Sequence, residues 1–295
     1  MFISDFLNYI EFERRYSVHT LTSYKRDLQQ FSDFLSQVYE IDSAQEIKFT
    51  IIRSWIAQLM EEGNSARTVN RKISTLKSYF RYLLKTGKID QNPTLKITGP
   101  KIRKKLPVFI EEKSMDFLVD DDLDMNSFKE VRDRLVVEFF YTTGMRRAEL
   151  IGIKTLDVDI NNQLIKVLGK RNKERLLPIH GSLLSLIDSY LSLKKNLNTS
   201  QQMEANFFIT EKGKKMYPEL VYRIVNNYLS RVSTQKKKSP HVLRHTFATH
   251  MLNHGADLNA VKELLGHANL AATQIYTHNT IDKLKNIYKL AHPKA

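Results

Sequence analysis

Apolar residues recur every three or four positions through the first hundred residues of the chain, which is the spacing of helices that bury one face. Such helices often begin after a serine or threonine, whose hydroxyl accepts a hydrogen bond from the first backbone N–H groups. The pattern predicts a helix over Ile3 to Arg14 and further helices after Ser17, Thr50 and Ser65, with Gly63 and Gly87 ending the last two. A small helical bundle is therefore expected over residues 1–98.

The pattern is mixed in residues 108–295. Ser127 and Glu130 have the spacing of a capping box, which predicts a helix that runs to Gly144. Short runs rich in Val, Ile, Leu and Phe predict strands at Leu164–Leu168, Glu174–Ile179 and Phe207–Thr210. Helical spacing returns at Leu183–Leu193, at Tyr217–Leu229, from Pro240 onward, and at 281–290. The expected fold class is mainly α, with a small β-sheet in the C-terminal domain.

Prolines and basic residues separate these two regions. Asn92-Pro93 and Gly99-Pro100 interrupt the helical pattern, and the segment KIRKK follows at 101–105. An extended basic linker is therefore expected at 99–107. Its candidates for contacts with phosphate groups are Lys101, Arg103, Lys104 and Lys105.

The charge of the chain favours a polyanionic partner. The chain has 46 Lys and Arg against 32 Asp and Glu, a formal net charge of +14. This excess is typical of proteins that bind nucleic acid, although a basic protein without such a partner has the same composition. The fourth predicted helix has a basic face that either binds DNA or faces solvent, formed by Arg67, Arg71, Lys72, Lys77 and Arg81.

The sequence also excludes several classes of protein. It has no cysteine, which excludes disulfides and thiolate metal sites. No apolar run approaches about 18 residues, and the N-terminus lacks the features of a signal peptide. A cytoplasmic protein without a membrane span is therefore expected. No Walker loop or GxGxxG motif occurs, so no nucleotide cofactor is expected.

Cleavage of a phosphodiester by a side chain needs a nucleophile, cations and a proton donor. Tyrosine is a weak nucleophile because its pKa is near 10, so a base or a positive field must activate it. Guanidinium groups suit the non-bridging oxygens of the phosphate, and a lysine can protonate the leaving oxygen. The sequence offers candidates for each part, namely Tyr276, Arg146, Arg244, His241, His267 and Lys170.

Each of these residues, taken singly, also has a structural interpretation as packing or as a solvated charge. The histidines between 241 and 267 further suggest zinc, since His241 and His245 are four residues apart, as are His250 and His254. The segment HVLRH lacks the glutamate of a zinc protease, and Arg244 would repel a divalent cation. No metal is therefore expected.

The order and spacing of the motifs carry more weight than any single residue. TGMRRAEL (143–150), GKRNKER (169–175), HVLRHTFATHML (241–252) and LLGHANLAATQIYTH (264–278) closely resemble the tyrosine recombinase family, most of all the Xer-type site-specific recombinases of bacteria. SVHTLTSYKRDLQQF and SARTVNRKISTLKSYFRYL are similar to the core-binding domain of that family. The resemblance implies a two-domain C-shaped DNA clamp, in which a helical core-binding (SAM-like) domain precedes the tyrosine recombinase catalytic domain.

The resemblance also implies roles for individual residues. Arg146 and Arg244 would bind the scissile phosphate with assistance from His267. Glu149 would orient Arg146.

The remaining candidates would carry out the proton transfers and the attack. His241 would be the acid–base partner, Lys170 would protonate the leaving 5′-oxygen, and Tyr276 would form a 3′-phosphotyrosine. The implied activity is site-specific cleavage and rejoining of double-stranded DNA without metal or ATP, in the resolution of chromosome or plasmid dimers at cell division. An integrase or transposase of a mobile element stays an alternative with the same chemistry. A catalytically inactive DNA-binding protein and a topoisomerase are alternatives of other classes.

The predicted helix 281–290 has an apolar stripe, formed by Ile281, Leu284, Ile287, Tyr288 and Leu290. Such a helix either packs on its own domain or docks into a groove of a neighbour. The resemblance implies exchange of this helix between protomers, within a homo- or hetero-tetramer on two DNA sites. A second Xer-type recombinase and a septal DNA translocase are the further partners that it suggests.

Overall fold

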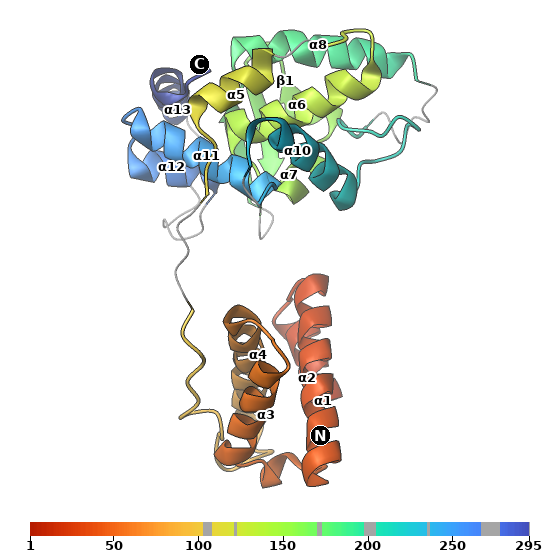
Figure 1. The fold of residues 1–295 in the computed structure, drawn as a ribbon, viewed down its shortest axis with the longest axis vertical. Helices are drawn as coiled ribbons and strands as arrows, with labels where there is room; N and C mark the ends of the chain where they lie inside the picture. Colours follow the sequence, from red (N-terminus) through yellow and green to blue (C-terminus); the bar gives the residue numbers. More distant parts are fainter. Residues whose placement is uncertain are drawn as a thin grey trace. The chain divides into compact units, whose positions relative to one another are not determined.

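The computed structural model describes residues 1–102, 108–120, 123–169, 173–197, 205–234, 237–266 and 278–294. The chain forms two compact units, Met1–Lys105 and Leu106–Ala295, which Figure 1 colours along the sequence. The boundary between them lies within residues 99–107, whose role as a linker stays a prediction. Within the described residues, no helix is long and apolar enough to cross a membrane.

The first unit is helical, as the sequence predicts. Its elements are α1 (Ile3–Asn8), a π-helical turn (Tyr9–Glu13), α2 (Val18–Tyr39), a 3₁₀ turn (Ala44–Glu46), α3 (Phe49–Glu61) and α4 (Ala66–Lys85). Aromatic side chains fill its core, and Phe31 packs on Trp55 with ring centroids 4.9 Å apart. The helices therefore bury the apolar faces that their spacing indicates.

The predicted helix starts can be compared with the observed ones. The Ser17 and Ser65 hydroxyls accept hydrogen bonds from the N–H groups of Thr20 and Thr68, so both predicted caps are confirmed. The predicted start at Thr50 is wrong, because α3 already begins at Phe49. Phe49 packs against the core, which brings it into the first turn ahead of the threonine.

The second unit is mainly α with a small sheet, which confirms the expected fold class. Its elements are α5 (Glu112–Asp120), α6 (Phe128–Thr143), α7 (Arg147–Gly152), a 3₁₀ turn (Thr155–Asp157), β1 (Val158–Asp159), β2 (Leu164–Leu168), β3 (Glu174–Pro178), α8 (Gly181–Lys195), α10 (Pro218–Val232), α11 (Pro240–Asn253), α12 (Leu258–Leu265) and α13 (His278–Ala291). Among the described residues, β1, β2 and β3 form one antiparallel sheet in that order.

One predicted strand is wrong and one strand was not predicted. The run from Phe207 to Thr210 forms only an isolated bridge, between Ile209 and Lys215. Phe207 and Phe208 are both buried; Phe207 stacks on Phe139 of α6 and Phe208 packs edge-on against it, so the apolar run serves packing against this helix. Strand β1 has two residues, which is too short for an alternating pattern to be recognised.

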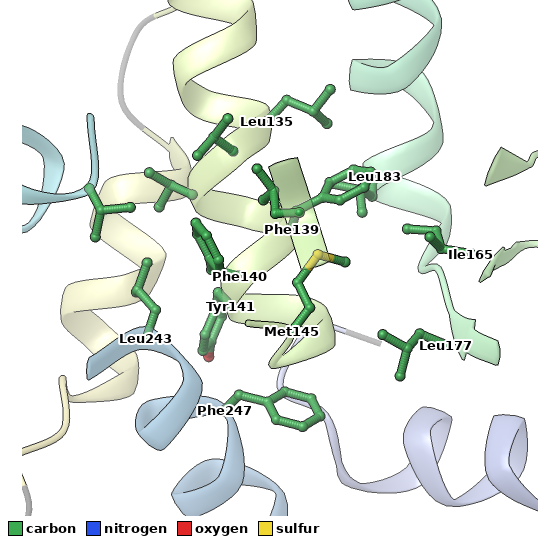
Figure 2. Close-up of a cluster of buried hydrophobic side chains, with 14 of the residues drawn as sticks. Leu135, Phe139, Phe140, Tyr141, Met145, Ile165, Leu177, Leu183, Leu243 and Phe247 are labelled. Carbon is green, nitrogen blue, oxygen red and sulfur yellow. The ribbon is translucent and has the colours of Figure 1, made fainter. Parts of the chain in front are cut away.

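Helix α6 is the centre of the second unit and is buried from Arg134 to Thr143. Figure 2 shows Leu135, Phe139, Phe140 and Tyr141 of α6. Around them lie side chains of α8, α11 and the sheet, namely Leu183, Leu243, Phe247, Ile165 and Leu177. The helix ends at Gly144 in the left-handed conformation (φ +60°), where a Cβ atom would lie 2.4 Å from the Phe247 ring. The core thus fixes the point at which the chain leaves α6.

The start of α6 has half of the predicted capping box. The Ser127 hydroxyl accepts a hydrogen bond from the Glu130 N–H at 3.4 Å. The Glu130 carboxylate accepts from the N–H of Asp124 and not from that of Ser127. The reciprocal hydrogen bond has therefore moved three residues upstream, where it fixes the turn before the helix.

Candidate active site

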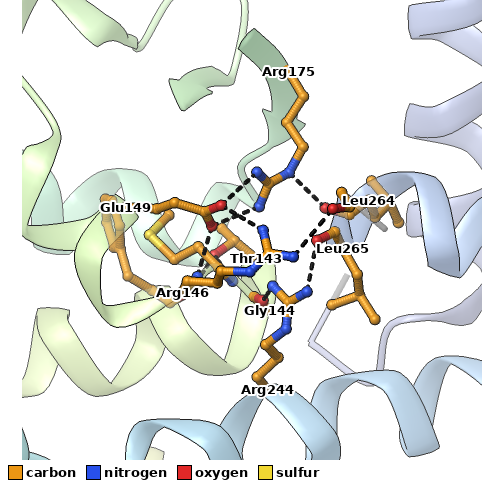
Figure 3. Close-up of polar contacts among 11 residues, drawn as sticks. Thr143, Gly144, Arg146, Glu149, Arg175, Arg244, Leu264 and Leu265 are labelled. Carbon is orange, nitrogen blue, oxygen red and sulfur yellow. Dashed lines mark hydrogen bonds and ion pairs between the residues drawn. The ribbon is translucent and has the colours of Figure 1, made fainter. Parts of the chain in front are cut away.

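Arg146 stands at the junction between the central helix and α7. Its backbone is extended, and its own N–H donates to Glu149 Oε2 at 2.7 Å. Its guanidinium donates through Nη1 to Glu149 Oε1 at 2.7 Å and through Nη2 to the Gly266 carbonyl at 3.1 Å. Glu149 therefore fixes both the backbone and the side chain of Arg146 (Figure 3).

Arg244 reaches the same place from α11. Its Nη1 donates to the Gly144 carbonyl and its Nη2 to the Leu265 carbonyl, both at 2.6 Å. Burial, followed by the nearby charge of Arg146, lowers the pKa of Arg244 to about 10, which leaves it cationic at neutral pH. The side chains of Arg146 and Arg244, almost a hundred residues apart in sequence, thus lie side by side.

The carbonyl groups that hold these arginines lie at the C-terminal ends of two helices. Gly144 follows α6 and Gly266 follows α12, and both glycines have a left-handed backbone. Carbonyl groups at a helix C-terminus have no partner within the helix and carry the negative end of the helix dipole. These ends therefore attract the guanidinium groups and fix their planes.

Arg175 is a third arginine of the site and was not among the residues predicted from the sequence. Its side chain, on β3, is only 6% exposed. It donates to both oxygens of Glu149, at 2.9 and 2.8 Å, and through Nε to the Leu264 carbonyl at 2.8 Å. The available signal was the alternation of the strand, which places Arg175 on the same buried face as Leu177.

Glu149 is the anion at the centre of this network. Burial raises the pKa of its carboxyl group, but hydrogen bonds from Arg175 and Arg146 outweigh that effect and bring the pKa down to about 2. The carboxylate is therefore ionised at any physiological pH. Together with Arg146, Arg175 and Arg244 it leaves a net of two positive charges, which suits a phosphate group.

Four of the seven predicted site residues are described. His241 is exposed in the first turn of α11, three residues before Arg244. Lys170, His267 and Tyr276 lie outside the described residues, and their placement stays a prediction. The structure thus brings together Arg146, Glu149 and Arg244 and puts His241 on the same helix as Arg244.

His250, on α11, and His254, directly after it, have structural partners. His250 is buried, with Nδ1 3.0 Å from the Tyr141 hydroxyl and Nε2 2.9 Å from the Ile110 carbonyl. His254 lies 2.8 Å from a carboxylate oxygen of Glu112. These contacts explain the second histidine pair of the sequence without a metal ligand role.

The predicted DNA-binding residues of α4 do not share one environment. Arg67, Arg71 and Arg81 are exposed and Lys77 is half-buried, but Lys72 is only 5% exposed, so its assignment to the basic face is wrong. Lys101 is exposed as well, whereas Arg103, Lys104 and Lys105 lie outside the described residues.

The reason for the burial of Lys72 is an aspartate on α2. Asp27 is fully buried, and its Oδ1 accepts a hydrogen bond from Lys72 Nζ at 3.0 Å. Its other oxygen accepts from Thr75 and from Arg71, whose side chain stays 45% exposed. A buried carboxylate requires cationic partners, so Lys72 packs inward.

Helix α13 packs on its own unit in this structure. Tyr288 and Ala291 are buried and Ile287 lies against the core, whereas Leu290 is 83% exposed. Leu290 therefore does not belong to the buried face, and the predicted stripe is wrong at that position. His292 follows the helix, is 4% exposed, and places Nε2 3.2 Å from the Tyr141 carbonyl.

Comparisons with known proteins agree with this geometry. Residues 109–283 match the phage integrase family, and residues 3–87 match the phage integrase N-terminal SAM-like domain. Tyrosine recombinase XerC of Chlorobaculum tepidum is 36% identical over 99% of this chain and 94% of its own length. Tyrosine recombinase XerC of Listeria innocua is 38% identical over 98% of this chain and 97% of its own length.

Solved structures share the fold. XerH site-specific recombinase bound to a palindromic difH substrate, in a post-cleavage complex, superposes with a TM-score of 0.73 at 23% identity, covering 96% of this chain and 83% of that one. A lambda integrase dimer bound to a COC′ core site gives 0.69 at 17% identity, covering 93% and 98%. With a family match over most of the chain and relatives of matching length, the chain belongs to the phage integrase family of tyrosine recombinases.

Proposed function

We propose that the chain is a site-specific DNA recombinase that cleaves and rejoins double-stranded DNA through a 3′-phosphotyrosyl intermediate on Tyr276. The observation that carries the proposal is the convergence of Arg146 and Arg244 beside one ionised carboxylate. Two guanidinium groups that lie side by side repel, and the protein holds them together with helix-end carbonyls. An anion between them removes that repulsion, and a phosphodiester has the right charge and geometry.

The steps of the proposed reaction assign one role to each predicted site residue. The Tyr276 hydroxyl oxygen attacks the phosphorus and gives its proton to His241, while the bond from phosphorus to the 5′-oxygen breaks. Lys170 donates a proton to that leaving oxygen. Arg146, Arg244 and His267 stabilise the negative charge that grows on the non-bridging oxygens.

Rejoining is the same reaction in reverse. A 5′-hydroxyl from either DNA attacks the phosphotyrosyl bond, and Tyr276 leaves with a proton. One phosphoester replaces another in each step, so no ATP is consumed. Attack by the original 5′-hydroxyl restores the site, and attack by that of a second DNA exchanges strands.

The first unit supplies DNA affinity in this proposal. Arg67, Arg71 and Arg81 are exposed on α4, and Lys101 is exposed near the end of the unit. Long basic side chains at a helix surface bind the phosphates of duplex DNA without reading the bases. The strongly basic composition of the whole chain, with a net charge of +14, supports this assignment.

The biological role in this proposal is the resolution of chromosome or plasmid dimers in the cytoplasm at cell division. The near-full-length likeness to XerC recombinases supports it. Four protomers, identical or with a second Xer-type recombinase, hold two DNA sites and exchange α13, and a septal DNA translocase activates them. An integrase or transposase of a mobile element stays the alternative, and sequencing of the DNA trapped by the protein distinguishes the two roles.

A suicide DNA substrate tests the chemistry. The cleaved strand of such a substrate loses its short 5′-hydroxyl fragment, so religation is blocked and the covalent complex accumulates. The intact protein is expected to form an adduct that resists SDS, and Tyr276→Phe to bind the same DNA without forming it. DNA binding without any adduct from the intact protein would show an inactive DNA-binding protein instead.

A further inference from the structure

We propose that Arg175 is a positioning residue of the active site, which neutralises Glu149 so that Arg146 and Arg244 keep their positive charge for the scissile phosphate. The proposal rests on the proposed function, since it gives Arg175 a part in the same reaction. Arg175 does not itself reach the DNA, because its side chain is 6% exposed and its donors are directed at Glu149 and Leu264. Figure 3 shows it on the side of the carboxylate opposite to Arg244.

The carboxylate of Glu149 is shared unequally between two arginines. Arg175 meets both of its oxygens with the two ends of the guanidinium fork, at 2.9 and 2.8 Å. The guanidinium of Arg146 meets one oxygen through one nitrogen, at 2.7 Å, and the side chain of Arg146 is 35% exposed. A two-point ion pair is the stronger of the two and Arg175 is the more buried partner, so Arg175 compensates most of the carboxylate charge.

This division sets the charge that faces the substrate. With Arg175 present, the described cluster of Arg146, Arg175, Arg244 and Glu149 has a net of two positive charges. A phosphodiester carries one negative charge, and attack by a phenolate oxygen adds a second in the transition state. Without Arg175, Glu149 would neutralise Arg146, and one positive charge would face a doubly negative transition state.

Arg175 also fixes the backbone that holds the other two arginines. Its Nε donates to the Leu264 carbonyl, and the next two carbonyls along the chain, of Leu265 and Gly266, accept from Arg244 and Arg146. A Cβ atom at Gly266 would lie 3.2 Å from the Arg175 guanidinium, which shows how closely this turn packs on it. One side chain on β3 thus connects α7 and the end of α12.

The test compares charge with geometry at one position. Arg175→Gln removes the charge and the fork, Arg175→Lys keeps the charge without the fork, and Glu149→Gln/Arg175→Gln restores the net charge with two neutral amides. Each variant is the full chain. The measurements are the single-turnover rate of adduct formation on the suicide substrate at saturating protein, the DNA dissociation constant by fluorescence anisotropy, and the melting temperature.

Arg175→Gln is expected to form the adduct about 100-fold more slowly, with DNA affinity changed less than about 3-fold. The double variant is expected to recover about 10-fold of this loss, and Arg175→Lys to fall between Arg175→Gln and the intact protein. A merely structural arginine would instead make the double variant as slow as Arg175→Gln or slower. If Arg175→Gln does not fold, the double variant decides: it is expected to form the adduct about 10-fold more slowly than the intact protein, and a loss of about 100-fold or more would overturn the proposal.

The result that overturns the proposal is a folded Arg175→Gln protein that cleaves at the rate of the intact chain, or a folded double variant no faster than Arg175→Gln. Failure of the proposed function gives a different pattern. In that case the intact protein itself forms no adduct on DNA that it binds, and the positioning role fails with it.

Discussion

At the scale of the residue, backbone carbonyls help to hold the two arginines of the site in place without neutralising their charge. Arg244 is held by the Gly144 and Leu265 carbonyls, and Arg146 by Glu149 and the Gly266 carbonyl. Carbonyl dipoles orient a guanidinium without cancelling its full charge, whereas a carboxylate on each arginine would cancel it. The two arginines are therefore fixed in place and still attract a phosphate.

Arg146→Lys tests the need for the planar group. A lysine keeps the charge, but it cannot contact Glu149, the Gly266 carbonyl and a phosphate oxygen from one rigid fork. Adduct formation is expected to fall by at least about 100-fold, with DNA binding largely kept. The matched control is Arg147→Lys, because the neighbouring arginine is exposed and, among the described residues, donates a hydrogen bond only to the Pro218 carbonyl, at 3.5 Å. Equal rates of adduct formation for Arg146→Lys and Arg147→Lys would contradict the assignment of Arg146 to the scissile phosphate.

At the scale of the element, sequence predicted the long helices well and the short or paired segments less well. The caps at Ser17 and Ser65 and the helix end at Gly144 are local signals, and the structure confirms them. The burial of Lys72 depends on Asp27, which lies 45 residues away on another helix. No pattern within α4 reveals such a partner, because lysine at that position fits a solvated face equally well.

The candidate site, like the fold, could be predicted only in part from the sequence. The motif around Arg146 and the one around Arg244 are recognisable as sequence, and the structure brings them together. Arg175 was missed because its importance comes from pairing across the fold with Glu149, and only the alternation of a short strand pointed to it. Lys170, His267 and Tyr276 rest on the sequence motifs alone.

Lys72→Met separates folding from DNA binding on α4. It removes the buried partner of Asp27 and is expected to lower the free energy of unfolding by about 3 kcal/mol, measured by urea denaturation. Its effect on DNA affinity, measured on folded protein, is expected to be small. The control Arg81→Ala changes an exposed residue of the same helix. It is expected to lower DNA affinity and to change the free energy of unfolding by less than about 0.5 kcal/mol. Loss of DNA affinity in Lys72→Met alone would contradict a purely structural role for Lys72.

The docking of α13 is expected to depend on pH through His292. Burial lowers the pKa of His292 to about 3, against the opposing hydrogen bond to the Tyr141 carbonyl. The neutral ring therefore stabilises the docked helix above the pKa of an undocked histidine, about 6.5. This contribution is lost progressively as the pH falls from about 6.5 toward 3.

Hydrogen exchange measures this effect. Amides of α13 in the intact protein are expected to lose protection between about pH 7.5 and about pH 5, after correction for the intrinsic exchange rate. His292→Gln cannot be protonated, so its protection is expected to change much less over the same range. Unchanged protection in the intact protein would show that His292 does not control the docking.

At the scale of the whole molecule, a helical unit with exposed basic side chains is joined to a unit that carries the proposed phosphate site. In this account the first unit contributes affinity, and the second contributes chemistry as well as affinity. The net charge of +14 makes binding a process that releases counterions. Affinity for the cognate DNA is expected to fall about 1000-fold between about 50 and about 200 mM salt, measured by anisotropy. A change below about 10-fold would argue against phosphate contacts by both units.

The most direct test of the central claim is to identify the residue that becomes attached to DNA. The adduct from the suicide substrate is digested with protease and nuclease, and the peptide that carries the nucleotide is sequenced by tandem mass spectrometry. We expect a 3′-phosphoryl linkage to Tyr276. A linkage to any other residue, or no nucleotide on any peptide of the protein after it has cleaved DNA, would contradict it.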